Sequence, residues 1–167
     1  NNGILDGKQY DYYKTGEVEY TVFYKNGFRE GYNYGYFKSG EIRSKAKYSN
    51  GLINGNGYEF YKNGKIKISM NFVDSLLEGE EIYFDENEKI LKILNYKNNE
   101  LDGKQKFYDL KSNNIDYTEL YLNGKRVDRK MALVIGNAAY EKGALENPVN
   151  DANLIAESLK KLDFEVF

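Results

Sequence analysis

Alternating apolar and polar residues run through the first three-quarters of the chain. Over residues 42–48 (IRSKAKY), small and apolar side chains take every second position and cations take the positions between them. Ile66, Ile68, Met70 and Phe72 repeat the alternation one unit later. A period of two is typical of a strand with one covered face. The pattern therefore predicts β-strands separated by short turns.

A short turn phrase returns along the same region, and four of its five intervals are 24 residues while the last is 25. Asn and Gly both tolerate positive φ, so Asn-Gly is the strongest short-range signal for a hairpin. We therefore expect five copies of one hairpin unit. The phrase occurs at Asn2-Gly3, Asn26-Gly27, Asn50-Gly51, Asp74-Ser75, Asn98-Asn99 and Asn123-Gly124.

Other offsets within the unit are also fixed. A Gly follows each turn, at Gly7, Gly31, Gly55, Gly79 and Gly103. Each copy closes on an aromatic residue, at Tyr24, Tyr48, Phe72, Tyr96 and Tyr121. A second turn lies at Gly16, Gly40 and Gly64 and degenerates to Glu88 and Ser112-Asn113. Hairpins in series predict an elongated antiparallel β-meander of about ten strands, mainly β in class, with equivalent aromatics stacked in ladders.

The 17 Tyr and 9 Phe leave two roles open. Packing within the sheet is the ordinary role, because these positions are the ones that a pleat buries. A stacking platform for sugars, bases or peptide is the alternative. The charged positions present a similar choice between a solvated face and a surface that docks another domain or protomer. They form a basic strip (Arg43, Lys45, Lys47, Lys65, Lys67) and an acidic strip (Glu78, Glu80, Glu81, Asp85, Glu86, Glu88).

The period stops after residue 124, and residues 126–130 read as a charged connector. The apolar run 131–135 is typical of a strand covered on both faces in a parallel sheet. Pro148 fits the first turn of a helix, which Asn150 or Asp151 can cap. Apolar residues then recur at helical spacing, and residues 164–167 begin another strand. Strand, helix and strand are the opening of an α/β domain.

Composition limits the chemistry that these residues can perform. The 24 Lys+Arg and 26 Asp+Glu nearly balance, which argues against general affinity for nucleic acid or anionic membrane. Zero Cys and zero His exclude a thiol or imidazole dyad within these residues. We therefore predict no catalytic residue, metal site or cofactor in this chain. No run is long enough to span a membrane, and we expect a cytoplasmic location.

Two resemblances follow from these motifs. Residues 2–125 resemble the MORN-repeat family in its variant form, written NG-x3-G-x4-YY-x2-G-x-I-x5-Y. Residues 131–167, with ALVIGNAAY and LENPVNDANLIAESLKKLDFEV, resemble the start of the caspase-like domain of bacterial metacaspase-type cysteine peptidases, the C14 or caspase family. Asp163 replaces the Gly that is usual there. The implied layout is repeats at 1–125, a connector at 126–130 and an incomplete α/β domain at 131–167.

The resemblance implies a peptidase whose His base and Cys nucleophile lie outside this chain, in a remainder of the domain that acts as its partner or as a separate chain. It aligns Asp151 with an aspartate near the pocket for a basic P1 side chain, and a helix cap is the other role for this residue. A basic preference would make Lys125, Arg126, Arg129 and Lys130 candidates for self-processing. The repeats would then regulate or scaffold the peptidase by binding a protein or peptide. A non-catalytic binding module of the antitoxin or adaptor type is the alternative.

Overall fold

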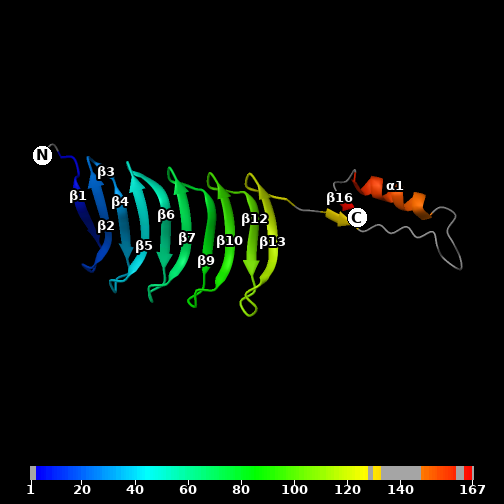
Figure 1. The fold of residues 1–167 in the computed structure, drawn as a ribbon. Helices are drawn as coiled ribbons and strands as arrows, with labels where there is room; N and C mark the ends of the chain where they lie inside the picture. The colour runs from blue at the N-terminus through cyan, green and yellow to red at the C-terminus, as the bar shows by residue number, and fades with distance from the viewer. Residues whose placement is uncertain (1–2, 128–129, 133–147, 161–163, 167) are drawn as a thin grey trace. The chain divides into compact units, whose positions relative to one another are not determined.

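The computed structural model of the chain describes residues 3–127, 130–132, 148–160 and 164–166. They belong to two compact units, Asn1–Arg126 and Val127–Phe167. Unit 1 holds a 14-stranded antiparallel sheet in which neighbours along the sequence pair in turn (Figure 1). The predicted mainly β fold, an antiparallel meander followed by an α/β element, is confirmed.

Ten strands of unit 1 have six or more residues, as the repeat pattern predicted. They are β1 (Gly7–Tyr12), β2 (Val18–Lys25), β4 (Gly31–Tyr36), β5 (Ile42–Ser49), β6 (Leu52–Phe60), β7 (Ile66–Val73), β9 (Gly79–Phe84), β10 (Ile90–Lys97), β12 (Gly103–Tyr108) and β13 (Ile115–Leu122). Four two-residue strands, not predicted, return from the Asn-Gly-type turns: β3 (Phe28–Arg29), β8 (Leu76–Leu77), β11 (Glu100–Leu101) and β14 (Lys125–Arg126).

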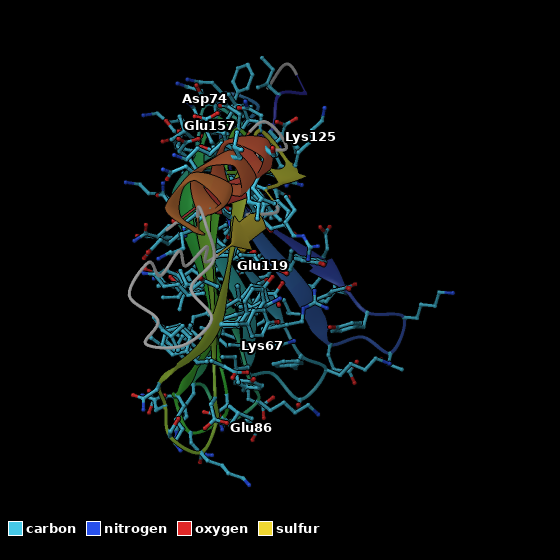
Figure 2. The ribbon with its side chains drawn as sticks, turned by 90° about the vertical axis from the view of Figure 1, so that its right-hand side faces the viewer. Lys67, Asp74, Glu86, Glu119, Lys125 and Glu157 are labelled. Carbon is cyan, nitrogen blue, oxygen red and sulfur yellow. The ribbon has the colours of Figure 1, made fainter. Side chains whose placement is uncertain are left out.

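The described residues of unit 1 form a single layer, with side chains on both sides of the sheet. Asp74 and Glu86 lie in turns at opposite ends of the strands (Figure 2). Among the residues described, only Val22 and Ile93 are buried hydrophobic side chains. Tyr12 remains 58% exposed, and Tyr10 and Tyr32 are exposed as well. The prediction that the pleat buries the tyrosines is wrong for these residues, because the described residues of unit 1 form one sheet and supply no second layer over either face.

A glycine and an aromatic residue face each other across the two strands of every copy. Each glycine has positive φ, between 69° and 93°, which side chains with a Cβ rarely adopt. The fixed offsets seen in the sequence therefore mark one cross-strand pair per copy. The pairs are Gly7 with Tyr24, Gly31 with Tyr48, Gly55 with Phe72, Gly79 with Tyr96 and Gly103 with Tyr121.

Successive Asn-Gly-type turns are bonded to one another. The second residue of each turn donates its backbone N–H to a carbonyl of the preceding copy, as Gly27 does to Leu5 at 2.8 Å. The first residue donates its N–H to a side-chain oxygen that recurs every 24 residues. These caps are Asp6 to Asn26, Glu30 to Asn50, Asn54 to Asp74, Glu78 to Asn98 and Asp102 to Asn123. This recurring cap was not predicted from the sequence.

Copies meet in two ways. Between the second and third copies, β6 runs unbroken and Gly57 pairs with Ala46 of β5. At the other three junctions the equivalent stretch is split into a short and a long strand. There the position of Gly57 holds a buried polar residue: Asn33, Glu81 or Gln105. The Oδ1 of Asn33 accepts the N–H of Phe23, and the Oε1 of Gln105 accepts that of Asn95.

Unit 2 contains β15 (Lys130–Ala132), α1 (Pro148–Lys160) and β16 (Phe164–Val166). β15 and β16 pair in parallel, with Met131 opposite Glu165. A parallel pair joined through a helix is the predicted strand, helix and strand. The rest of the predicted apolar run, 133–135, lies outside the described residues. Ile155, predicted on the apolar face of the helix, is 54% exposed.

Candidate functional site

One face of unit 1 is hollowed into a groove of about 470 Å³ that draws residues from β1 to β7. Ala46, Met70 and Phe72 supply apolar surface within it. A concave, mostly apolar surface with a few placed polar groups is the usual form of a ligand site. The groove is therefore the candidate functional site of the repeats.

Two tyrosines of the groove each have an arginine guanidinium group over the ring. The guanidinium of Arg43 lies 5.3 Å from the ring centroid of Tyr20 and donates to its hydroxyl at 2.7 Å. Arg29 lies 5.4 Å from the ring centroid of Tyr48 and donates to that hydroxyl at 3.4 Å. A hydrogen bond to Tyr24 is the main cause that raises the pKa of Arg29. These contacts hold both guanidinium groups in place and cover one face of each ring.

Asn33 is the polar residue within the groove that is most deeply buried, with 8% of its surface exposed. Its Oδ1 accepts the N–H of Phe23 at 2.8 Å. Its Nδ2 is buried and has no hydrogen-bond partner within the described part of the chain. A buried donor without a partner costs free energy, so a ligand that brings an acceptor here gains it back.

Asp11 and Glu59 contribute carboxylates to the groove lining. They belong to one row of residues paired across five neighbouring strands. Within the groove lining, Asp11 and Glu59 are the first and last residues of this row, and Tyr20, Gly35 and Ser44 lie between them. Neither carboxylate makes an ion pair with a residue of the described ranges. This row therefore offers negative charge to a ligand.

Aromatic rings on the opposite face of β1, β4 and β6 lie next to one another along their own strands, stacked on β1 and tilted on β4 and β6. The ring centroids of Tyr32 and Tyr34, and of Tyr34 and Tyr36, are 6.5 Å apart. The predicted stacking between equivalent aromatics of successive copies is wrong for the described ring contacts. Successive copies are instead linked by hydroxyls: Tyr13 donates to the carbonyl of Tyr36, and Tyr61 to that of Phe84.

The two predicted charge strips are largely engaged within the sheet. The Nζ of Lys45 lies 4.2 Å from the ring centroid of Tyr32. Lys65 donates to the carbonyl of Glu86 in the next copy and lies 3.6 Å from the carboxylate of Glu88. Such exposed contacts contribute little stability each.

The residues predicted from the peptidase resemblance lie in and beside unit 2. Asp151 is the fourth residue of α1, so it lies inside the helix and is not its N-cap. Lys125 and Arg126 form β14 at the end of unit 1 and pair with β13, and Arg126 lies 3.3 Å from the carboxylate of Glu119. Lys130 begins β15, and Arg129 lies outside the described residues.

Within the ranges that the structure describes, no group of three carboxylate, His or Cys side chains could hold a metal ion. No helix in that part of the chain is long and apolar enough to cross a membrane.

Comparison with known families supports the predicted layout. The model of the MORN repeat variant matches residues 5–26, 53–74 and 77–98. The model of the caspase domain matches residues 129–167. The predicted resemblances are therefore confirmed, in the predicted order along the chain. The second and fifth copies, outside the three matches, form the same pairs of strands. No curated protein matches the chain significantly.

Proposed function

We propose that this chain, in which variant MORN repeats precede a caspase-domain segment, is the regulatory part of a bacterial caspase-like cysteine peptidase. The observation that carries the proposal is the succession of the two family matches in one chain. The groove on the repeats is where a protein partner would bind, and binding would control the peptidase. Because these 167 residues include neither His nor Cys, the catalytic pair belongs to the remainder of the peptidase.

In that remainder, an imidazole would take the proton of a thiol, and the thiolate would attack the scissile carbonyl. The role of this chain would be to supply two strands, β15 and β16, and one helix, α1, to the peptidase domain. Asp151 would lie near the pocket for a basic P1 side chain. Its place inside α1, rather than at the N-cap, supports a role other than capping.

The peptidase assignment can be tested in the whole protein with a fluorogenic substrate that has arginine at P1. Asp151→Asn is expected to lower kcat/KM for this substrate by at least about tenfold, because the charge pair between Asp151 and the P1 arginine is lost. Glu157→Gln, an exposed position on the same helix, is the matched control and should leave kcat/KM unchanged. Equal rates for both variants would contradict the role of Asp151. A wild-type protein without turnover would favour the non-catalytic adaptor.

The regulatory role can be tested in the same protein. Ala46→Leu fills the groove without changing charge. Extract of the source cells is expected to change turnover of the wild-type enzyme and of the Glu86→Gln control, whose residue lies at a turn outside the groove lining (Figure 2). Ala46→Leu should lose this response. A response that survives in Ala46→Leu would remove the groove from regulation.

Self-processing completes the proposal. Lys125, Arg126, Arg129 and Lys130 are its candidate sites, and intact-mass measurement of the whole enzyme incubated alone is expected to show cleavage after one of them. Lys125 and Arg126 pair with β13, and Lys130 pairs with β16. Since a peptidase needs an unpaired, extended substrate, cleavage after these three residues requires their short strands to open. A chain that stays intact in active enzyme would contradict this step.

A further inference from the structure

The groove has a charge polarity along the strands. Arg29, Gly31, Asn33 and Gly35 follow one another at every second position along β3 and β4. Arg29 gives one end of the groove a positive charge. At the other end lies the row closed by the carboxylates of Asp11 and Glu59, and Gly35 is the middle of that row.

The guanidinium of Arg43 also lies at the Gly35 end, bonded to Tyr20. Two carboxylates outnumber this one guanidinium, and the ammonium of Lys45, which also lines the groove, lies over the ring of Tyr32. Between the two charged ends lie the unpartnered Nδ2 of Asn33 and the apolar surface of Ala46 and Phe72. Along the strands, the groove thus presents the positive charge of Arg29, then the neutral donor of Asn33 beside apolar surface, and then the carboxylates of Asp11 and Glu59.

We propose that this groove binds an extended peptide segment with an acidic residue at one end, bulky apolar residues in the middle and a basic residue at the other end. This inference rests on the proposed function and names the chemistry of the partner. From Arg29 to Gly35 the strand rises by roughly 20 Å, at about 3.3 Å for each residue. A ligand of about six extended residues spans that length.

On binding, the buried Nδ2 of Asn33 turns toward a backbone carbonyl in the middle of the peptide and donates to it. An apolar side chain of the peptide covers Ala46. Oligosaccharides fit less well, because sugars stack on open aromatic faces. Here Arg43 covers a face of Tyr20 and Arg29 a face of Tyr48. The contacts within the groove therefore favour a peptide.

The test uses the full chain and fluorescence anisotropy with two labelled hexapeptides. Both have leucine at the two central positions; one has glutamate and lysine at its ends, and the other has glutamine at both. The charged peptide is expected to bind with a Kd on the order of 10–100 μM at low salt. It should bind about fivefold tighter than the neutral peptide, and the difference should vanish in about 0.5 M salt.

Single substitutions separate the three parts of the groove. Glu59→Gln and Arg29→Gln should each weaken the charged peptide about threefold and leave the neutral peptide unchanged. Asn33→Asp keeps the oxygen that bonds Phe23 and loses the donor, so it should weaken the neutral peptide about tenfold. Ala46→Leu should abolish binding of both, and Glu86→Gln should change neither. Thermal unfolding checks that each variant folds, and Glu59→Gln alters only a half-buried side chain.

Several results would overturn the inference: no binding of either peptide up to about 1 mM, equal affinity for the two peptides at low salt, or binding that survives in Ala46→Leu. Binding of chitotetraose by calorimetry, lost in Ala46→Leu, would overturn it in favour of sugars. If peptide binding fails while extract still regulates the peptidase through the groove, the proposed function stands and only the ligand assignment falls.

Discussion

The junction at Gly57 and the junction at Gln105 join equivalent strands in different ways. At Gly57 two backbones come close enough to pair, and β6 continues through the junction. At Gln105 the backbones separate, and the side chain makes three hydrogen bonds, with the N–H and carbonyl of Asn95 and the carbonyl of Gly103. A buried amide can thus replace backbone pairing where strands diverge.

Of the changes at these junctions, removal of the Gln105 amide should lower the free energy of unfolding the most. Gln105 is 0% exposed, so Gln105→Ala strips partners from buried backbone groups and leaves a cavity. We expect the free energy of unfolding to fall by about 3 kcal/mol, measured by urea denaturation with circular dichroism. Gln9→Ala, at the equivalent but exposed position, is the control and should change it by less than about 0.5 kcal/mol. Similar losses in both would show that burial does not matter here.

Conversion of the glycine junction into the polar type should have the next largest effect. A Cβ at Gly57 would lie 2.9 Å from Cε2 of Phe72, so Gly57→Asn forces the ring to move. We expect a loss of about 2 kcal/mol in the free energy of unfolding, by the same measurement. In a Phe72→Leu background the added cost should shrink, because the smaller side chain leaves room. An unchanged cost in that background would place the strain elsewhere.

The reverse conversion, Asn33→Gly, should cost less. It removes the hydrogen bond to the N–H of Phe23, but it also removes the buried amide that has no partner within the described residues. The two changes oppose each other, so we expect a loss of about 1 kcal/mol in the free energy of unfolding. A loss as large as that of Gln105→Ala would mean that the Nδ2 of Asn33 is satisfied after all.

The junction at Glu81 should make the free energy of unfolding depend on pH, and this is the smallest of the expected effects. Burial, and then the charge of Glu81, raise the pKa of Tyr83 above its usual value of 10.0, and the same causes raise that of Tyr96. A tyrosine whose pKa is raised by folding stabilises the fold fully below pH 10 and loses this contribution as the pH rises above it. The free energy of unfolding should therefore fall as the pH rises above 10.0, the usual pKa of tyrosine. Glu81→Gln should make that fall shallower, and an identical slope would contradict the assignment.

Much of unit 1 follows from local chemistry that the sequence displays. Asn26, Asn50 and Asn123 take positive φ in the turns, as the Asn-Gly phrase predicted. Glu88 and Asn113 take positive φ where copies four and five have lost the glycine of the second turn. In unit 2, α1 begins at the predicted Pro148. These features depend on neighbouring residues alone, so a pattern can specify them.

The groove and its polar residues depend on how strands diverge, which no local pattern specifies. Gln9, Asn33, Glu81 and Gln105 recur at multiples of 24 residues, so the position was visible in the sequence. The role of this position could not be predicted, because it depends on how the neighbouring strand lies. Gln9 is exposed, Asn33 bonds through its oxygen alone among the described residues, and Gln105 bonds through both ends of its amide. The exposure of the tyrosines has a similar origin. Alternation predicts which residues share a face, but not whether another layer covers that face.

The caps that bond each turn to the one before it have a mechanical consequence. Since the described copies of unit 1 contact only their neighbours, a pulling force on its two ends would detach them one at a time from an end. Each detached copy of 24 residues would lengthen the tether by roughly 80 Å before the next one yields. The force trace would then resemble a staircase, with one step for each turn released.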